Sequence, residues 1–93
     1  PFADKWKAFG FDVKVINGHR FDEICEAIEY AINAKEKPVC IIADTVKGQG
    51  ISYMAGNYKW HYGAIDDDKF ALAMKDLDKY YAERIAFVEK EAK

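Results

Sequence analysis

The sequence predicts an α/β fold: a strand, a helix and a second strand that form part of a parallel sheet, followed by a helical C-terminal segment. Three observations carry this prediction. Residues 11–16 alternate apolar and polar side chains, residues 22–34 have a helical period, and residues 39–43 form a short apolar run rich in β-branched side chains. Elements in this order are typical of a βαβ unit, for which a right-handed crossover is expected.

The first two elements have clear local signals. A short amphipathic helix over residues 3–9 carries Trp6 and Phe9 on one side. Gly10 follows directly and is suited to ending the helix in a left-handed turn. The strand over residues 11–16 then places apolar side chains at its odd positions, which predicts one buried face.

The next helix and strand follow a turn predicted at residues 17–18. Asp22 is placed to cap a helix that runs to about Ala34. Pro38 ends this region, and the apolar run over residues 39–43 predicts a strand covered on both faces. The predicted buried stripe of the helix consists of Ile24, Ile28, Ala31 and Ile32.

A long loop with four glycines is predicted from Thr45 to about Ile65. Loops of this length in compact proteins are usually functional or disordered, and the aromatic side chains here favour a functional loop. Acidic residues at 66–68 suit the start of a last helix from Lys69 onward, with a break near Asp78. Its apolar stripe, which we expect to pack internally or against a partner, consists of Phe70, Met74, Leu77, Tyr81, Ile85 and Val88.

The length of the chain indicates one partial domain over residues 1–93. Two strands do not make a stable sheet alone, so we expect more chain or another subunit to supply the remaining strands. The absence of an initiating Met favours a fragment or a trimmed product. An exposed sheet edge and the long terminal stripe also predict association into an oligomer.

Composition narrows the class of protein. The chain is 51% apolar and 32% charged, as in globular proteins, and its net charge of −2 argues against nucleic acid as a partner. No apolar run is long enough to span a bilayer, so no membrane role is expected. Cys25 and Cys40 lack metal-ligand spacing and are interpreted as buried thiols in a reducing, cytoplasmic protein.

The candidate site lies in the glycine-containing loop. Lys47 stands beside Gly48, and His61 follows Trp60 later in the same loop. Glycines let the backbone approach a ligand closely, Lys supplies a compact positive charge, and His supplies a hydrogen-bond donor or proton carrier near neutral pH. The pattern favours an anionic cofactor at a strand end, although each residue taken alone is also compatible with a solvated loop position.

Other motifs in the chain carry less information. The glycine spacing matches neither the dinucleotide fingerprint nor a P-loop, since a third glycine and a Gly-Lys-Ser/Thr sequence are absent. His19 follows the first strand and is interpreted as a structural turn residue. Asp44 ends the second strand, but one carboxylate is not a metal site, so no metal ligand is predicted in this chain.

Ordered motifs from Ala3 to about Leu77 resemble transketolase, in the part of its diphosphate-binding domain that follows the metal-binding motif. The resemblance is carried by the segments Asp4–Phe11, Asn17-Gly18-His19, Pro38–Thr45, Lys47–Met54 and Trp60-His61. The resemblance is greatest to the shorter form of transketolase, in which the two catalytic domains are separate chains. This chain resembles the N-terminal one of the two. The resemblance implies a thiamine diphosphate-binding fold.

By this resemblance, Lys47 lies near the diphosphate of thiamine diphosphate, and His61 contacts both the diphosphate and the substrate and takes part in catalysis. The implied reaction, in the pentose phosphate pathway, transfers a two-carbon ketol unit from a ketose phosphate to an aldose phosphate. The resemblance also implies magnesium or calcium, with ligands outside this chain, and a C-terminal, pyrimidine-binding partner subunit. The isolated chain is expected to be inactive.

The chain departs from the family pattern at Asn17, Arg20 and Tyr62. Tyr62 separates His61 from Gly63, where the family commonly has His followed by Gly. The Gly-Asp-Gly to Asn motif that holds the metal in the family is not in these residues. Two alternatives therefore stay open: a fragment similar to 1-deoxyxylulose-5-phosphate synthase, and a non-catalytic α/β assembly module.

Overall fold

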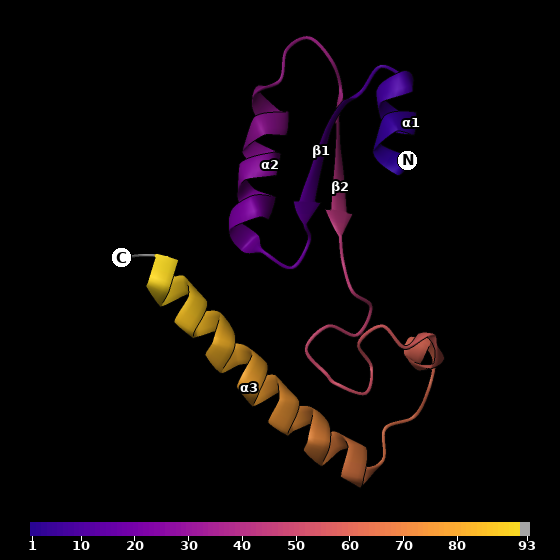
Figure 1. The fold of residues 1–93 in the computed structure, drawn as a ribbon, viewed down its shortest axis with the longest axis vertical. Coiled ribbons are helices and arrows are strands. Elements are labelled where there is room, and N and C mark those ends of the chain that lie inside the picture. Colours follow the sequence, from indigo (N-terminus) through magenta and orange to yellow (C-terminus); the bar gives the residue numbers. More distant parts are fainter. Residues whose placement is uncertain (92–93) are drawn as a thin grey trace. The chain divides into compact units, whose positions relative to one another are not determined.

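A computed structural model describes residues 1–91 (Figure 1). The chain divides into two compact units, Pro1–Thr45 and the segment from Val46 onward. The first unit holds the strands, and the second holds the glycine-containing loop and the last helix. Each unit is described below by itself.

The first unit is the predicted βαβ arrangement preceded by a short helix. Strand β1 (Asp12–Asn17) pairs in parallel with β2 (Val39–Asp44), and Asp12 lies opposite Val39 and Asn17 opposite Asp44. The connection between the strands is α2 (Phe21–Asn33), which contacts both of them (Figure 1). The α/β class and the parallel pairing predicted from the sequence are confirmed.

Helix α1 (Phe2–Ala8) is held by an aromatic cluster rather than by the predicted pair of Trp6 and Phe9. The Trp6 ring packs edge-on against Phe2 and Phe11, with ring centroids 6.1 and 5.1 Å apart. Phe9 follows the helix as its C-cap and is 82% exposed, so its predicted place beside Trp6 is wrong. Gly10 adopts φ +95°, which confirms the predicted left-handed turn.

Helix α2 differs from the prediction at its start and along its buried face. It begins at Phe21 with Arg20 as N-cap and without a side-chain cap, because Asp22 instead pairs with Arg20 at 2.6 Å. Ala27 is the buried residue, whereas Ile28 and Ile32 are 48% and 76% exposed. The predicted stripe placed the two isoleucines on the covered face, but the helix turns its small residue toward the strands.

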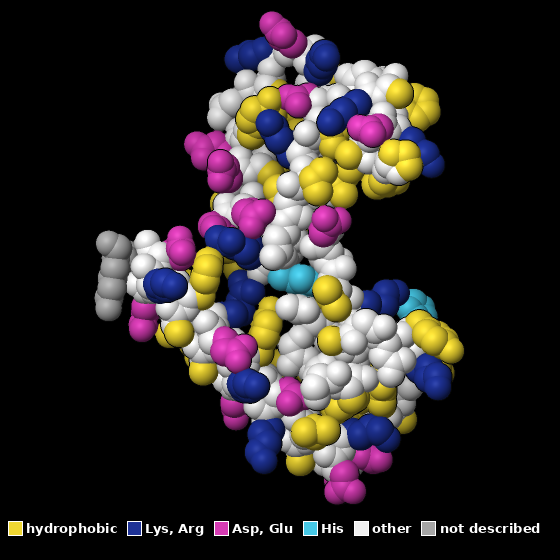
Figure 2. Space-filling view, viewed as in Figure 1, with side chains coloured by type: hydrophobic (Ala, Val, Ile, Leu, Met, Phe, Trp, Pro, Cys, Tyr) yellow, Lys and Arg dark blue, Asp and Glu magenta, His cyan; other side chains and the backbone are white. Residues whose placement is uncertain are grey.

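Strand β2 is half-buried from Val39 to Ile42 and exposed at Ala43 and Asp44, so the prediction of cover on both faces is wrong for the described residues. Among residues 1–91, only Ala27 and Ala73 are buried. Many large apolar side chains are exposed, and Figure 2 shows them in yellow among charged groups of both signs. The described chain therefore leaves much of its apolar surface without cover.

The second unit contains a one-turn 3-10 helix, η1 (Tyr58–His61), and α3 (Asp67–Glu91). The predicted loop from Thr45 to Ile65 has no strand or α-helix, but the sequence interpretation missed η1 within it. Helix α3 starts in the predicted acidic segment and runs without the predicted break near Asp78. None of the helices described within residues 1–91 combines the length and apolar character required to cross a bilayer.

The covered side of α3 is not its apolar stripe. Every residue of the predicted stripe is exposed, from Leu77 at 39% to Tyr81 at 68%. The more buried positions of this helix are Lys69, Ala73, Asp76, Tyr80 and Arg84. The stripe is therefore exposed in the described chain, and its packing against a partner stays a prediction.

The two thiols also differ from expectation. Cys25 is exposed on α2, so its interpretation as a buried thiol is wrong. Cys40 on β2 is half-buried, and both cysteines are free.

Candidate functional site

The glycine-containing loop folds back on itself because glycines occupy its left-handed positions. Gly48 has φ +78°, and a Cβ built on it lies 2.6 Å from the backbone carbonyl carbon and oxygen of Met54. Gly56 has φ +71° and donates its N–H to the Lys47 carbonyl at 2.9 Å, which closes the loop. A residue with a side chain at position 48 would push the two passes of backbone apart. The glycine pattern thus sets the path of the chain beside Lys47.

A side-chain cap at Asn57 fixes the direction in which the loop leaves this closure. The Asn57 side-chain oxygen accepts the Lys59 N–H at 3.1 Å, and the Asn57 carbonyl accepts the Trp60 N–H, also at 3.1 Å. Both bonds start η1, the turn that carries His61. Asparagine is a favoured residue for this role because its short side chain reaches the first free backbone donors of a helix. The cap is the one sequence signal that was available for η1.

Trp60 anchors η1 through aromatic packing. Its ring lies 5.1 Å from that of Tyr53 in a tilted arrangement, and the Lys69 ammonium lies 5.7 Å from its centroid. The Tyr53 hydroxyl donates to the Lys69 carbonyl at 2.9 Å. Aromatic pairs of this kind stabilise a contact beyond the area that they bury. The residue before His61 is therefore held by the loop and by the first turn of α3.

These constraints bring the two predicted site residues together. The Lys47 Nζ lies 3.3 Å from the His61 Nδ1, although the residues are 14 positions apart in the chain. Both residues are exposed, and within residues 1–91 no carboxylate forms an ion pair with Lys47. Two nitrogen groups that can donate hydrogen bonds thus converge at a surface position where a positive charge is not neutralised. This arrangement suits an anionic ligand.

Helix α3 holds the loop at a second point, which the sequence did not reveal. The Ser52 N–H and hydroxyl both donate to Oδ2 of Asp76, at 2.8 and 2.6 Å. The two bonds from Ser52 lower the pKa of Asp76 below its usual value. No motif relates residues 24 positions apart, so only the fold could show this tether.

The carboxyl ends of the strands form a separate cluster in the first unit. Asn17 accepts the His19 N–H through its side chain at 2.9 Å, and Gly18 donates to the Asp44 carbonyl at 2.7 Å. A Cβ built on Gly18 lies 2.5 Å from a Thr45 methyl group, which explains the glycine in this turn. His19 and Asp44 therefore lie near this edge of the sheet, where their backbones join the strands.

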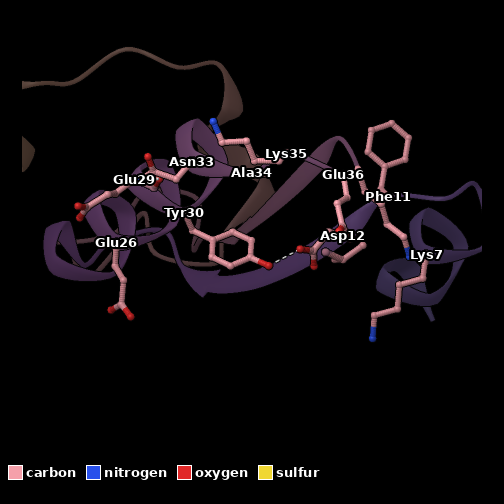
Figure 3. Close-up of a pocket in the computed structure, with 12 residues that line it drawn as sticks. Lys7, Phe11, Asp12, Glu26, Glu29, Tyr30, Asn33, Ala34, Lys35 and Glu36 are labelled. Carbon is pink, nitrogen blue, oxygen red and sulfur yellow. Dashed lines mark hydrogen bonds between the residues drawn. The ribbon is translucent and has the colours of Figure 1, made fainter.

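A broad hollow of about 1000 Å³ lies at the other end of the strands and is lined by charged groups of both signs (Figure 3). In it the Tyr30 hydroxyl donates to Asp12, and this bond raises the pKa of Tyr30. The Lys14 ammonium lies 4.0 Å above the Tyr30 ring. The figure shows Tyr30 pointing across the hollow toward Asp12, so the hydroxyl and the carboxylate are hydrogen-bonded to each other.

Metal-binding side chains do not gather in the part of the chain that the structure describes: no group of three His, Cys, Asp or Glu residues is close enough to hold an ion. The Lys47 and His61 pair is accordingly the one predicted site whose members the structure brings together.

Comparison with known proteins gives a consistent family. The model of the transketolase thiamine diphosphate binding domain matches residues 2–88. The chain is 39% identical over 79 residues to the 6-deoxy-6-sulfo-D-fructose transketolase subunit of Clostridium sp. (strain MSTE9), covering 85% of this chain and 29% of that protein. It is 36% identical over 88 residues to an apulose-4-phosphate transketolase subunit of Phocaeicola vulgatus, covering 95% of this chain and 30% of that one.

A human transketolase is 35% identical over 60 residues, which is 64% of this chain and 9% of the human protein. The chain therefore spans less than a third of the length of these curated relatives.

Proposed function

Because the chain belongs to the transketolase family, in its thiamine diphosphate-binding domain, we propose that it forms one wall of a thiamine diphosphate site and that Lys47 and His61 contact the diphosphate. The observation that carries the proposal is the 3.3 Å approach of Lys47 Nζ to His61 Nδ1 in a loop closed by glycines. This approach joins the two residues that the family resemblance places at the cofactor.

The donor set fits a diphosphate. A Lys ammonium and an imidazole N–H both donate to phosphate oxygens, and charge-assisted bonds of this kind are shorter and stronger than neutral ones. Lys47 carries no described ion pair that a diphosphate would have to break. When bound, thiamine diphosphate supplies the carbanion-stabilising chemistry, and the protein orients it. In this proposal Lys47 binds and orients the diphosphate, and His61 offers it a hydrogen-bond donor.

The complete activity that we propose is the transfer of a two-carbon ketol unit between sugar phosphates, with His61 also contacting the substrate. That activity requires groups beyond this chain: ligands for magnesium or calcium, together with a partner subunit that binds the pyrimidine ring. The naming of two relatives as transketolase subunits supports a partner.

Calorimetric titration of thiamine diphosphate with magnesium into the assembled enzyme that contains this chain tests the proposal. Lys47→Ala removes a charge-assisted contact, which is worth about 1.5–3 kcal/mol, so we expect cofactor affinity to fall about 10- to 100-fold. His61→Ala is expected to reduce ketol transfer more than cofactor affinity. Lys59→Ala, which removes an exposed Lys from η1, serves as the matched control.

An unchanged affinity in Lys47→Ala, with the control also unchanged, would show that Lys47 does not contact the diphosphate. Ketol transfer equal to the parent in His61→Ala would show that His61 has no role in the reaction. Heat on titration into the isolated chain would contradict the expectation that the site needs other chains.

A further inference from the structure

The contact between Lys47 and His61 determines which ring nitrogen of His61 carries a proton. A Lys ammonium has three donors and no acceptor. Its Nζ lies 3.3 Å from Nδ1, so in a hydrogen bond from the ammonium the acceptor is Nδ1 without a proton. The proton of the neutral imidazole is therefore on Nε2.

We propose that Lys47 is a positioning residue that holds His61 as the Nε2–H tautomer, so that the ring presents a hydrogen-bond donor, and not a base, to an anionic oxygen of the ligand. The proposal deepens the proposed function, on which its choice of a phosphate or substrate oxygen as ligand rests. The tautomer itself depends only on the contact between the two side chains.

The surroundings of the pair support a persistent contact. Lys47 is tied to the loop closure through its carbonyl, which accepts the Gly56 N–H. The ring of His61 follows Trp60, whose packing on Tyr53 fixes η1. None of the described residues forms a hydrogen bond with Nε2 of His61, and the residue is exposed. Nε2–H is therefore available to a ligand.

The tautomer decides what the ring can do. A neutral imidazole protonated at Nε2 has no lone pair there, so it does not remove a proton from a substrate at that atom. It stabilises negative charge on a facing oxygen by donating, and such a preorganised donor acts most strongly where charge develops during the reaction. Lys47 then has two roles. One of its N–H groups orients the His61 ring, and the remaining N–H groups donate to the anion.

Nitrogen NMR of the full chain with ¹⁵N-labelled histidine tests the assignment. The chain has only two histidines, so His61→Gln identifies the signals, and His19 in the other unit is an internal reference. At a pH where the rings are neutral, we expect the Nε2–H pattern for His61 with Nδ1 as a hydrogen-bonded acceptor. Lys47→Met should move the Nδ1 resonance toward that of a free acceptor, and Lys47→Arg should restore it. His19 signals should stay in place, as should His61 signals in Lys59→Met.

An Nδ1–H pattern in the parent chain, or an Nδ1 resonance equal in parent and Lys47→Met, would overturn the proposal. Retained circular dichroism in Lys47→Met confirms that the variant is folded. Addition of inorganic pyrophosphate with magnesium to the assembled enzyme, in which only this chain carries the labelled histidine, separates this proposal from the proposed function. A shift at Nε2 of His61 supports both, whereas the expected tautomer without any response to pyrophosphate keeps the tautomer assignment and counts against the diphosphate role.

Discussion

At the scale of single residues, the site depends on a few positions where only one residue type fits. Gly48 is such a position, because its φ is +78° and the space beside it is filled by the Met54 backbone. Gly56 shares the left-handed conformation, at φ +71°, but has nothing within 4 Å of a built Cβ. A comparison of the two positions therefore separates the free-energy cost of the left-handed conformation from the cost of steric overlap with the Met54 backbone.

Substitution of these glycines should have unequal effects. Gly56→Ala adds only the left-handed strain of about 1–2 kcal/mol to the free energy of folding. Gly48→Ala adds the same strain and an overlap with backbone, and crowding of this kind costs a further 1–3 kcal/mol, roughly. Urea unfolding of both variants measures the difference. Equal losses of stability would show that the Met54 backbone does not constrain position 48.

At the scale of elements, helix α3 holds the glycine-containing loop through hydrogen bonds. Asp76 accepts two hydrogen bonds from Ser52, and the Lys69 carbonyl accepts one from Tyr53. Asp66 caps the helix by accepting the Lys69 N–H at 2.8 Å, and this bond lowers the pKa of Asp66. Asp76 and the Lys69 carbonyl thus join α3 to donors of the loop.

The tether at Asp76 should weaken in acid. The pKa of Asp76 is lowered in the folded chain by the two bonds from Ser52, so the unfolded chain binds the proton more tightly. The contribution of the tether is therefore fully present above the ordinary value of 3.8 and is lost as the pH falls through the folded pKa. Hydrogen exchange at the Ser52 amide, measured against pH, reports the loss.

Asp76→Asn should flatten this pH dependence, because the amide does not titrate. Asp78→Asn is the control, since Asp78 is exposed on the same helix. A Ser52 amide whose exchange responds equally in the two variants would contradict the tether.

At the scale of the whole molecule, the chain has little core of its own. Only two alanines are buried among residues 1–91, and the apolar stripe of α3 is exposed. Burial of apolar surface is the main force that stabilises folded proteins, so we expect a chain with this much exposed apolar surface to gain stability from association. The chain also spans less than a third of the length of two relatives that are named as transketolase subunits.

We expect the isolated chain to self-associate at micromolar concentrations. Tyr81→Lys places a charge in the stripe, at a position that is 68% exposed, and should weaken self-association several-fold. Tyr62→Lys changes an equally aromatic residue that is 93% exposed and lies outside the stripe, and should leave association as it is. Sedimentation velocity over a concentration series provides the measurement. A monomer at all concentrations would show that the stripe does not drive association.

Local patterns in the sequence were sufficient for the βαβ order, the left-handed turn at Gly10 and the acidic start of α3, because each depends on residues close together in the chain. The parallel pairing joins residues far apart in the chain, such as Asp12 and Val39, and it was predicted from the order of strand, helix and strand. The choice of Lys47 and His61 came from residue chemistry and from the family resemblance. Their assignment as cofactor contacts stays a prediction.

Tertiary structure alone decided which faces are covered and how the loop is held. Ile28 and Ile32 are exposed and Ala27 is buried, because the side of α2 that meets the strands depends on packing and not on the helical period. The contact of Lys47 with His61 requires the loop closure, and the bonds of Ser52 to Asp76 join positions with no pattern between them. Such contacts are set by three-dimensional proximity, which a linear sequence does not specify.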